Sequence, residues 1–193
     1  MSSAPPEGEA QPAATHRLFF ALVPDPATRE RLAHAGEVLK ASRPGARLRW
    51  VHPARYHATV HFLGNDTALR PELVDAAVAA AGTVRSAPFA WTLDSVASFH
   101  GRQPPCVLRG AVIPAALQEL WHALGHALLL AGLGGHLERS FIPHVTLAYS
   151  HGAMLEPAAI EPVTWPVADF ALLHSVVGQG GYRTLGRWAL AQG

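Results

Sequence analysis

The sequence predicts an α+β fold in which strands dominate and about three helices lie between them. Short apolar runs that alternate with polar residues, or that end at Gly or Pro, are typical of strands. Three longer segments instead repeat apolar residues at helical spacing. With 193 residues, of which 49% are hydrophobic and 15% charged, the chain can bury a core and is not expected to be disordered.

The first half of the chain alternates strands and helices. Residues 16–23 (HRLFFALV) form an apolar run that ends at Pro24, as expected of a buried strand. Asp25 and Pro26 then offer an N-cap and a proline at the first helical position, which predicts a helix over about 26–41. The other elements expected here are strands at 48–51, 56–63 and 89–96 and a helix at 69–84.

The second half contains the clearest helix, which begins at Pro114. Its apolar residues lie on one face, and Gly132 follows as an end signal. The members of that face are Leu117, Leu120, Trp121, Leu124 and Leu128. Strands are expected at 106–112, 141–150, 170–177 and 184–190.

The amino terminus and the single cysteine bear on domains and compartment. Residues 1–15 (MSSAPPEGEAQPAAT) lack the basic and apolar regions of a secretory signal and are expected to form a flexible tail. Residues 16–193 are then expected to form a single domain of two lobes. The lone Cys106 excludes an internal disulfide, so a cytoplasmic location is expected. No apolar stretch is long enough to predict a membrane span.

The chain carries the pattern His-x-Thr-hydrophobic twice, at residues 57–60 (HATV) and 144–147 (HVTL). Each copy falls in an expected strand, and each half of the chain also has a helix, which suggests an internal duplication of about 85–90 residues. Residues i and i+2 of a strand face the same side, so each strand presents one imidazole and one hydroxyl together. By the same rule His61 is expected on the face of His57 and Thr59.

Two such strands suit the hydrolysis of a cyclic phosphodiester. The reaction needs a base to take a proton from water and an acid to protonate the departing ribose oxygen, and histidine can do either near neutral pH. His57 and His144 are the candidates for these roles. The hydroxyls of Thr59 and Thr146 can donate hydrogen bonds to the phosphate oxygens. The pattern alone fits a structural histidine as well as a catalytic one.

Longer segments resemble the 2H phosphoesterase superfamily, and within it the LigT-like RNA 2′,3′-cyclic phosphodiesterases. The similar segments are 17–24 (RLFFALVP), 49–64 (RWVHPARYHATVHFLG), 141–148 (FIPHVTLA) and 172–190 (LLHSVVGQGGYRTLGRWAL). The resemblance implies a bilobal fold in which two pseudo-symmetric antiparallel sheets flank a central cleft, with helices on the outside. It implies the opening of an RNA 2′,3′-cyclic phosphate to a 2′-phosphomonoester without a metal, with His57 as acid and His144 as base, or the reverse.

The chain departs from this family pattern after the second motif. Related sequences often carry a basic residue where this chain has Tyr149, so Arg102, His61 and His100 are the candidates to replace that cation. Tyr182, next to the glycines of the last expected turn, is a candidate to stack on a base.

The remaining expectations concern partners and competing functions. No cofactor or metal is expected, because His122 and His126 lack the Glu of an HExxH zinc motif at residue 123, which is Ala. A net charge of +1 does not suit a protein that coats nucleic acid, so the expected partners are RNA 3′ ends or small cyclic nucleotides. No protein partner is evident, and a monomer is expected. The alternatives are an RNA-end binder without catalysis and a sibling activity such as 2′–5′ ligation.

Overall fold

The computed structural model describes residues 14–191, and the predicted α+β class with two antiparallel sheets is confirmed there. Most of the predicted tail, residues 1–13, lies outside the described residues, as do residues 192–193. The α-helices are α1 (Pro26–Ser42), α2 (Pro71–Thr83) and α3 (Ala115–Leu130), and the short 3-10 helices are η1 (Pro53–Arg55) and η2 (Gly134–His136). The strands are β1 (His16–Leu22), β2 (Leu48–Trp50), β3 (Ala58–Asp66), β4 (Phe89–Ser98), β5 (Pro105–Arg109), β6 (Val145–Ser150), β7 (Ala158–Val167), β8 (Asp169–Val176) and β9 (Arg183–Ala189).

The first sheet has the order β3-β1-β8-β9, with every neighbouring pair antiparallel. Its central strand β1 is buried on both faces. Leu18, Phe20 and Leu22 belong to the main core, whereas Phe19 and Ala21 belong to a small cluster on the other side. This double burial explains why residues 18–22 are all apolar instead of alternating with polar residues.

The second sheet has the order β2-β6-β5-β4-β7 and is also antiparallel. Its strand β7 is absent from the predicted elements. The strand contains Pro162 and Pro166, which cannot donate a ladder hydrogen bond and which argue against a strand on sequence alone. Because β7 lies at the edge of the sheet, one side of the strand needs no partner, and the prolines are tolerated there.

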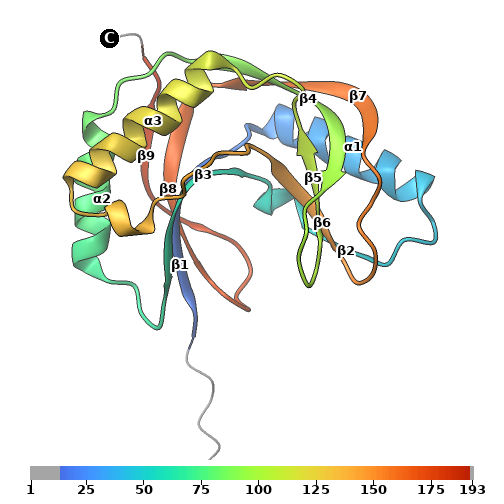
Figure 1. Ribbon diagram of the computed structural model, residues 1–193, viewed down its shortest axis with the longest axis horizontal. Helices are drawn as coiled ribbons and strands as arrows, with labels where there is room; N and C mark the ends of the chain where they lie inside the picture. Colours follow the sequence, from blue (N-terminus) through green and yellow to red (C-terminus); the bar gives the residue numbers. More distant parts are fainter. Residues whose placement is uncertain (1–13, 192–193) are drawn as a thin grey trace, which may run out of the picture.

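The helices lie on the outside of the two sheets, as Figure 1 shows. α2 and α3 pack against each other and over the first sheet. α1 follows β1 of the first sheet in the chain but packs against β7 of the second sheet. The connection from β1 to α1 therefore ties the two halves of the molecule together.

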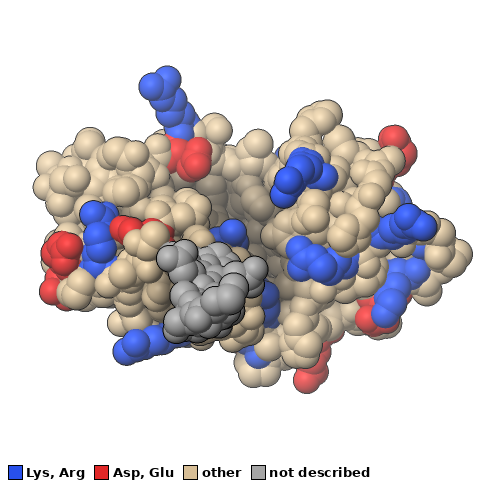
Figure 2. Space-filling view, turned by 90° about the horizontal axis from the view of Figure 1, so that it is seen from below, with Lys and Arg blue, Asp and Glu red and all other residues tan. Residues whose placement is uncertain are grey.

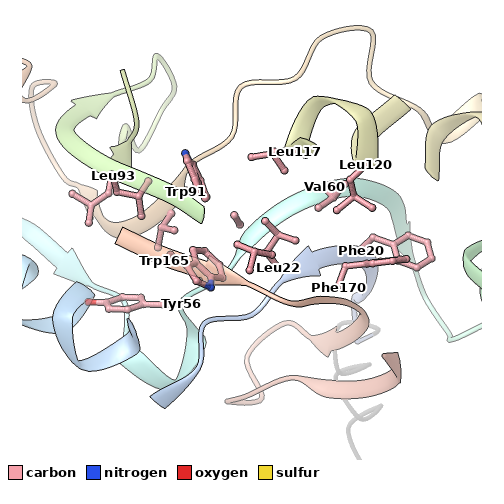
Figure 3. Close-up of a cluster of buried hydrophobic side chains, with 14 of the residues drawn as sticks. Phe20, Leu22, Tyr56, Val60, Trp91, Leu93, Leu117, Leu120, Trp165 and Phe170 are labelled. Atoms are coloured by element: carbon pink, nitrogen blue, oxygen red, sulfur yellow. The ribbon is translucent and has the colours of Figure 1, made fainter. Parts of the chain in front are cut away.

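The main core is continuous from one sheet to the other (Figure 3). Phe20 and Phe170 fill its part beneath the first sheet, and the stacked rings of Trp91 and Trp165 fill its part at the second, with ring centroids 5.8 Å apart. All four side chains are almost completely buried. The relative position of the sheets is thus fixed by close packing rather than by a flexible linker.

None of the helices within residues 14–191 combines the length and the apolar character that crossing a bilayer requires.

Candidate active site

A cavity of about 830 Å³ opens between the two sheets. Both predicted His-x-Thr pairs line it: His57 and Thr59 from the first sheet, His144 and Thr146 from the second. The two motifs lie 87 positions apart in the chain, so the fold alone brings them to one place. Figure 2 shows the hollow between the two halves of the molecule, with basic side chains around it.

Each histidine immediately precedes the first residue of its strand, rather than lying within it. The ring of His57 is fixed by a hydrogen bond between its Nδ1 and the carbonyl oxygen of Arg55, at 2.8 Å. A carbonyl oxygen can only accept, so Nδ1 carries the proton and Nε2 is the nitrogen left for a substrate. The rings of Phe19 and Tyr182 contact the imidazole, the first tilted and the second nearly perpendicular, with centroids 5.2 and 5.0 Å from that of His57.

His144 is held in the same way by a residue at the same offset. Its Nδ1 donates to the carbonyl oxygen of Ile142 at 2.7 Å, and the ring of Phe99 meets it edge-on at 4.9 Å between centroids. Both imidazoles are therefore oriented by the backbone two residues earlier, and both leave Nε2 for the cavity. Two such nitrogens in one cavity can act as a proton donor and a proton acceptor.

Burial lowers the pKa of both histidines below the ordinary value of 6.5. For His57, the hydrogen bond to the Arg55 carbonyl opposes this shift, whereas the charges of His144 and Arg55 lower the pKa further. For His144, the hydrogen bond to Ile142 opposes the shift, and the charge of Arg109 adds to it. Both rings line one cavity, and a charge on His144 disfavours a charge on His57.

His61 does not belong to this site, contrary to the expectation that it shares a face with His57 and Thr59. In the pairing of β1 with β3, Ala21 lies opposite Thr59 but Phe20 lies opposite His61, so Val60 is an extra residue. Such a bulge reverses the alternation of side chains. His61 is consequently turned into the interior, where it is 2% exposed.

The buried His61 contacts α3. Its Nε2 bonds to the carbonyl oxygen of Trp121 at 2.9 Å, and its ring stacks on that of Trp121. A Cβ at Gly125 would lie 3.2 Å from the His61 ring, so the glycine leaves room for the imidazole against the helix. His61 is thus a structural residue, and Phe62 takes its expected place in the cavity lining.

Arg102 and His100 are exposed in the loop between β4 and β5, and neither lines the cavity. The expected cation comes instead from three other arginines, Arg17, Arg49 and Arg55. These arginines are not among the residues predicted for the site, although they lie in segments 17–24 and 49–64, which resemble the LigT-like family. No Asp or Glu is found among the described residues that line the cavity, which is therefore positively charged.

Arg49 supplies a positive charge next to position 149, where this chain has a tyrosine instead of a basic residue. Arg49 of β2 lies directly opposite Tyr149 of β6, and its guanidinium lies over the Tyr149 ring, 4.9 Å from the centroid. Both side chains line the cavity. The neighbouring strand thus supplies a positive charge at this position, and the tyrosine ring supports it.

Tyr182 lines the cavity as expected, but its ring is already in contact with protein. The guanidinium of Arg55 lies 5.1 Å from its centroid and donates to its hydroxyl at 3.5 Å. Together with Phe19, the pair forms a wall beside His57.

Comparison with known proteins agrees with this arrangement. Residues 22–108 match the family model of LigT-like phosphoesterases. The chain is 35% identical, over 139 residues, to an RNA 2′,3′-cyclic phosphodiesterase of Geobacillus stearothermophilus; the match covers 70% of this chain and 42% of that relative. These matches support the assignment of this chain to the 2H phosphoesterase superfamily.

Solved structures of LigT-like proteins extend the match to nearly the whole chain. The crystal structure of Escherichia coli LigT in its apo form superposes with a TM-score of 0.73 and 29% identity, over 93% of this chain and 99% of that one. The same protein in complex with 3′-AMP gives a TM-score of 0.71 and 26% identity, over 93% and 99% of the chains. The predicted LigT-like fold is thus confirmed, whereas the curated relative from Geobacillus is matched over less than half of its length.

Proposed function

We propose that this protein hydrolyses RNA 2′,3′-cyclic phosphate ends to 2′-phosphomonoesters, with His57 and His144 as an acid–base pair and without a metal. The observation that carries the proposal is the matched pair of imidazoles in one cavity, each with Nδ1 bonded to a backbone carbonyl. The name of the Geobacillus relative and the 3′-AMP complex of E. coli LigT support this substrate class.

In the proposed reaction, Nε2 of neutral His144 takes a proton from a water molecule as its oxygen forms a bond to phosphorus. The bond from phosphorus to O3′ breaks, and protonated His57 gives its proton to O3′. The product keeps the phosphate on O2′, and proton exchange with solvent restores both histidines. Thr59 and Thr146 donate hydrogen bonds to the non-bridging oxygens, where negative charge accumulates, and Arg49 and Arg55 add positive charge around them.

The lowered pKa values set the pH dependence. One histidine must be neutral and the other protonated, so kcat/KM follows a bell-shaped curve. Burial lowers the pKa of both histidines from 6.5. We therefore expect both pKa values that define the kcat/KM curve, and the pH of its maximum, to lie below about pH 6.5.

A direct test incubates the protein, treated with a chelator, with an oligonucleotide that ends in a 2′,3′-cyclic phosphate. The expected product carries its phosphate on O2′, which phosphorus NMR distinguishes from O3′. Hydrolysis that disappears on chelation and returns with a divalent metal would reject the metal-free mechanism. Binding of the oligonucleotide with no turnover would favour an RNA-end binder instead.

A further inference from the structure

Arg17 lies on the cavity side of β1, away from the proposed reaction centre. Residues i, i+2 and i+4 of a strand share a face, which places Arg17 with Phe19 and Ala21. Phe19 contacts the His57 ring, and Ala21 pairs with Thr59, so this face leads from the catalytic pair along the strand. Arg17 itself lines the cavity.

The position of Arg17 along the strand sets the size of ligand that could reach it. Four residues separate Arg17 from Ala21, and a strand advances by about 3.3 Å per residue. The backbone of Arg17 is therefore about 13 Å from the point that faces Thr59. A group bound by Arg17 is distinct from the phosphate held between the two histidines.

The surface between these two points is apolar. The rings of Phe19, Phe62 and Tyr182 line the cavity there, and they pack against the buried side chains of Ala21, Ala171 and Leu173. Such a surface suits a ribose or a base rather than a charged group. The cavity thus offers positive charge at two places, with an apolar stretch between them.

Arg17 is available to bind an anion. The ion pairs found within residues 14–191 do not include it, and its side chain is exposed. Ser175 lies directly opposite Arg17 on β8 and also lines the cavity, so the two side chains leave neighbouring strands on the same face. A guanidinium and a hydroxyl are suitable donors to phosphate oxygens.

We propose that Arg17, with Ser175, forms a second phosphate subsite that binds a phosphate on the 5′ side of the terminal nucleoside. This inference rests on the proposed function and deepens it. A nucleoside 2′,3′-cyclic phosphate fills only the catalytic phosphate position, whereas an oligonucleotide fills both. The favoured substrate is therefore a chain with at least one further phosphate.

The test compares kcat/KM for three substrates in each variant: a nucleoside 2′,3′-cyclic phosphate, the same compound with a 5′-phosphate, and a trinucleotide that ends in the cyclic phosphate. For the wild-type protein we expect the trinucleotide to exceed the nucleoside by about tenfold or more, the size of one charge-assisted hydrogen bond. The 5′-phosphorylated nucleoside shows whether the first phosphate on the 5′ side is the one bound.

In Arg17→Ala the ratio of trinucleotide to nucleoside should fall toward one, and in Arg17→Lys it should be intermediate because a point charge remains. The matched control is Arg85→Ala, which also removes one arginine. Arg85 follows α2 on the outside of the molecule and bonds to the carbonyls of Gly82 and Val84. Its ratio should equal that of the wild type.

Salt dependence gives a second readout. The plot of log(kcat/KM) for the trinucleotide against log salt concentration should become less steep by about 0.7 in Arg17→Ala, the loss of one phosphate contact on a single strand. If Arg17→Ala changes neither the ratio of kcat/KM for trinucleotide to nucleoside nor the slope of the salt dependence, the proposed subsite is wrong.

The proposed function and the subsite fail in different ways. If the wild-type protein hydrolyses none of the three substrates, the proposed function is wrong, and the subsite is judged by binding alone. Calorimetry then compares a nucleoside 3′-monophosphate with a trinucleotide 3′-phosphate. A tighter trinucleotide complex in the wild type but not in Arg17→Ala would support the subsite; equal affinities in the two proteins would reject it.

Discussion

The segments that lead into His57 and His144 orient their imidazoles by the same bond, but they are themselves held in different ways. Before His57, the backbone forms the 3-10 helix η1, with Arg55 N–H bonded to the His52 carbonyl and Tyr56 N–H bonded to the Pro53 carbonyl. This support is local in sequence. These short-range hydrogen bonds position the Arg55 carbonyl, which accepts a hydrogen bond from His57 Nδ1.

The residues directly before His144 have no helix or strand. Their support is a stack of three rings from three parts of the chain. His61 of β3 stacks on Trp121 of α3, and Trp121 stacks on Phe141, with centroids 5.5 Å apart at both steps. Phe141 immediately precedes Ile142, whose carbonyl holds His144. The two imidazoles are thus oriented by the same kind of hydrogen bond. The segment before His57 is held by hydrogen bonds between residues close in sequence, whereas the segment before His144 is held by packing between residues far apart in sequence.

The largest expected effect comes from removing either imidazole. His57→Ala and His144→Ala should each lower kcat by about 10²–10⁴, because each loses one proton transfer. The double variant should be little worse than the single ones, since the two groups act as a unit. Steady-state kinetics on a cyclic-phosphate oligonucleotide measures this, and near-normal rates in both single variants would contradict the acid–base pair.

Arg49 and Arg55, which both line the cavity, should differ in their effect on pH dependence. Arg49→Ala and Arg55→Ala should each raise KM about tenfold through the loss of a charge-assisted contact to phosphate. The charge of Arg55 also lowers the pKa of His57, so Arg55→Ala should in addition move one limb of the pH profile to higher pH. Arg49→Ala serves as the matched comparison, because Arg49 does not contribute to the pKa of either histidine. Identical profiles in the two variants would contradict this difference.

Trp121→Leu tests the ring stack. Loss of the ring frees Phe141 and the Ile142 carbonyl, so kcat should fall about three- to tenfold, as expected of misplaced catalytic groups. The bond to Ile142 raises the pKa of His144, and its loss should move one pH limb lower. Trp121→Phe should restore much of the rate.

The matched control for Trp121 is Trp188→Leu. Trp188 is also half-buried and stacked, at 5.4 Å from Phe170, but on the far side of the first sheet from the cavity. The Trp188→Leu variant should be less stable than the wild type, but the dependence of its kcat/KM on pH should not change. A shifted pH profile in Trp188→Leu, or an unshifted one in Trp121→Leu, would contradict the proposal that the ring stack orients His144.

The smallest expected effect concerns stability. Burial lowers the pKa of His61, so the folded protein resists its protonation and the unfolded chain binds the extra proton below the ordinary pKa of 6.5. The free energy of unfolding should therefore be highest above pH 6.5 and fall as the pH drops toward the lowered pKa. In His61→Gln, whose amide can still donate to the Trp121 carbonyl, urea titrations should show a weaker dependence on pH. An equally steep decline in the variant would assign the effect to the other buried histidines.

The sequence by itself determined most elements and the chemistry of the site. Apolar runs and helical spacing predicted the three helices and every strand except β7, because each element buries a face with its own period. The His-x-Thr pattern selected four of the residues that line the cavity, since the i and i+2 positions of one strand are close in any fold.

The tertiary structure decided what depends on neighbouring strands. The bulge at Val60 turns His61 inward, and the edge position of β7 admits two prolines; neither is visible without the pairing of strands. Arg49 reaches Tyr149 only through cross-strand register, and Arg17 joins the cavity lining only because β1 pairs with β8, which carries Ser175. Local sequence specifies on which side of its own element a side chain lies. The charge of the cavity is the sum of charges on residues from several elements, and only the packed fold brings these residues together.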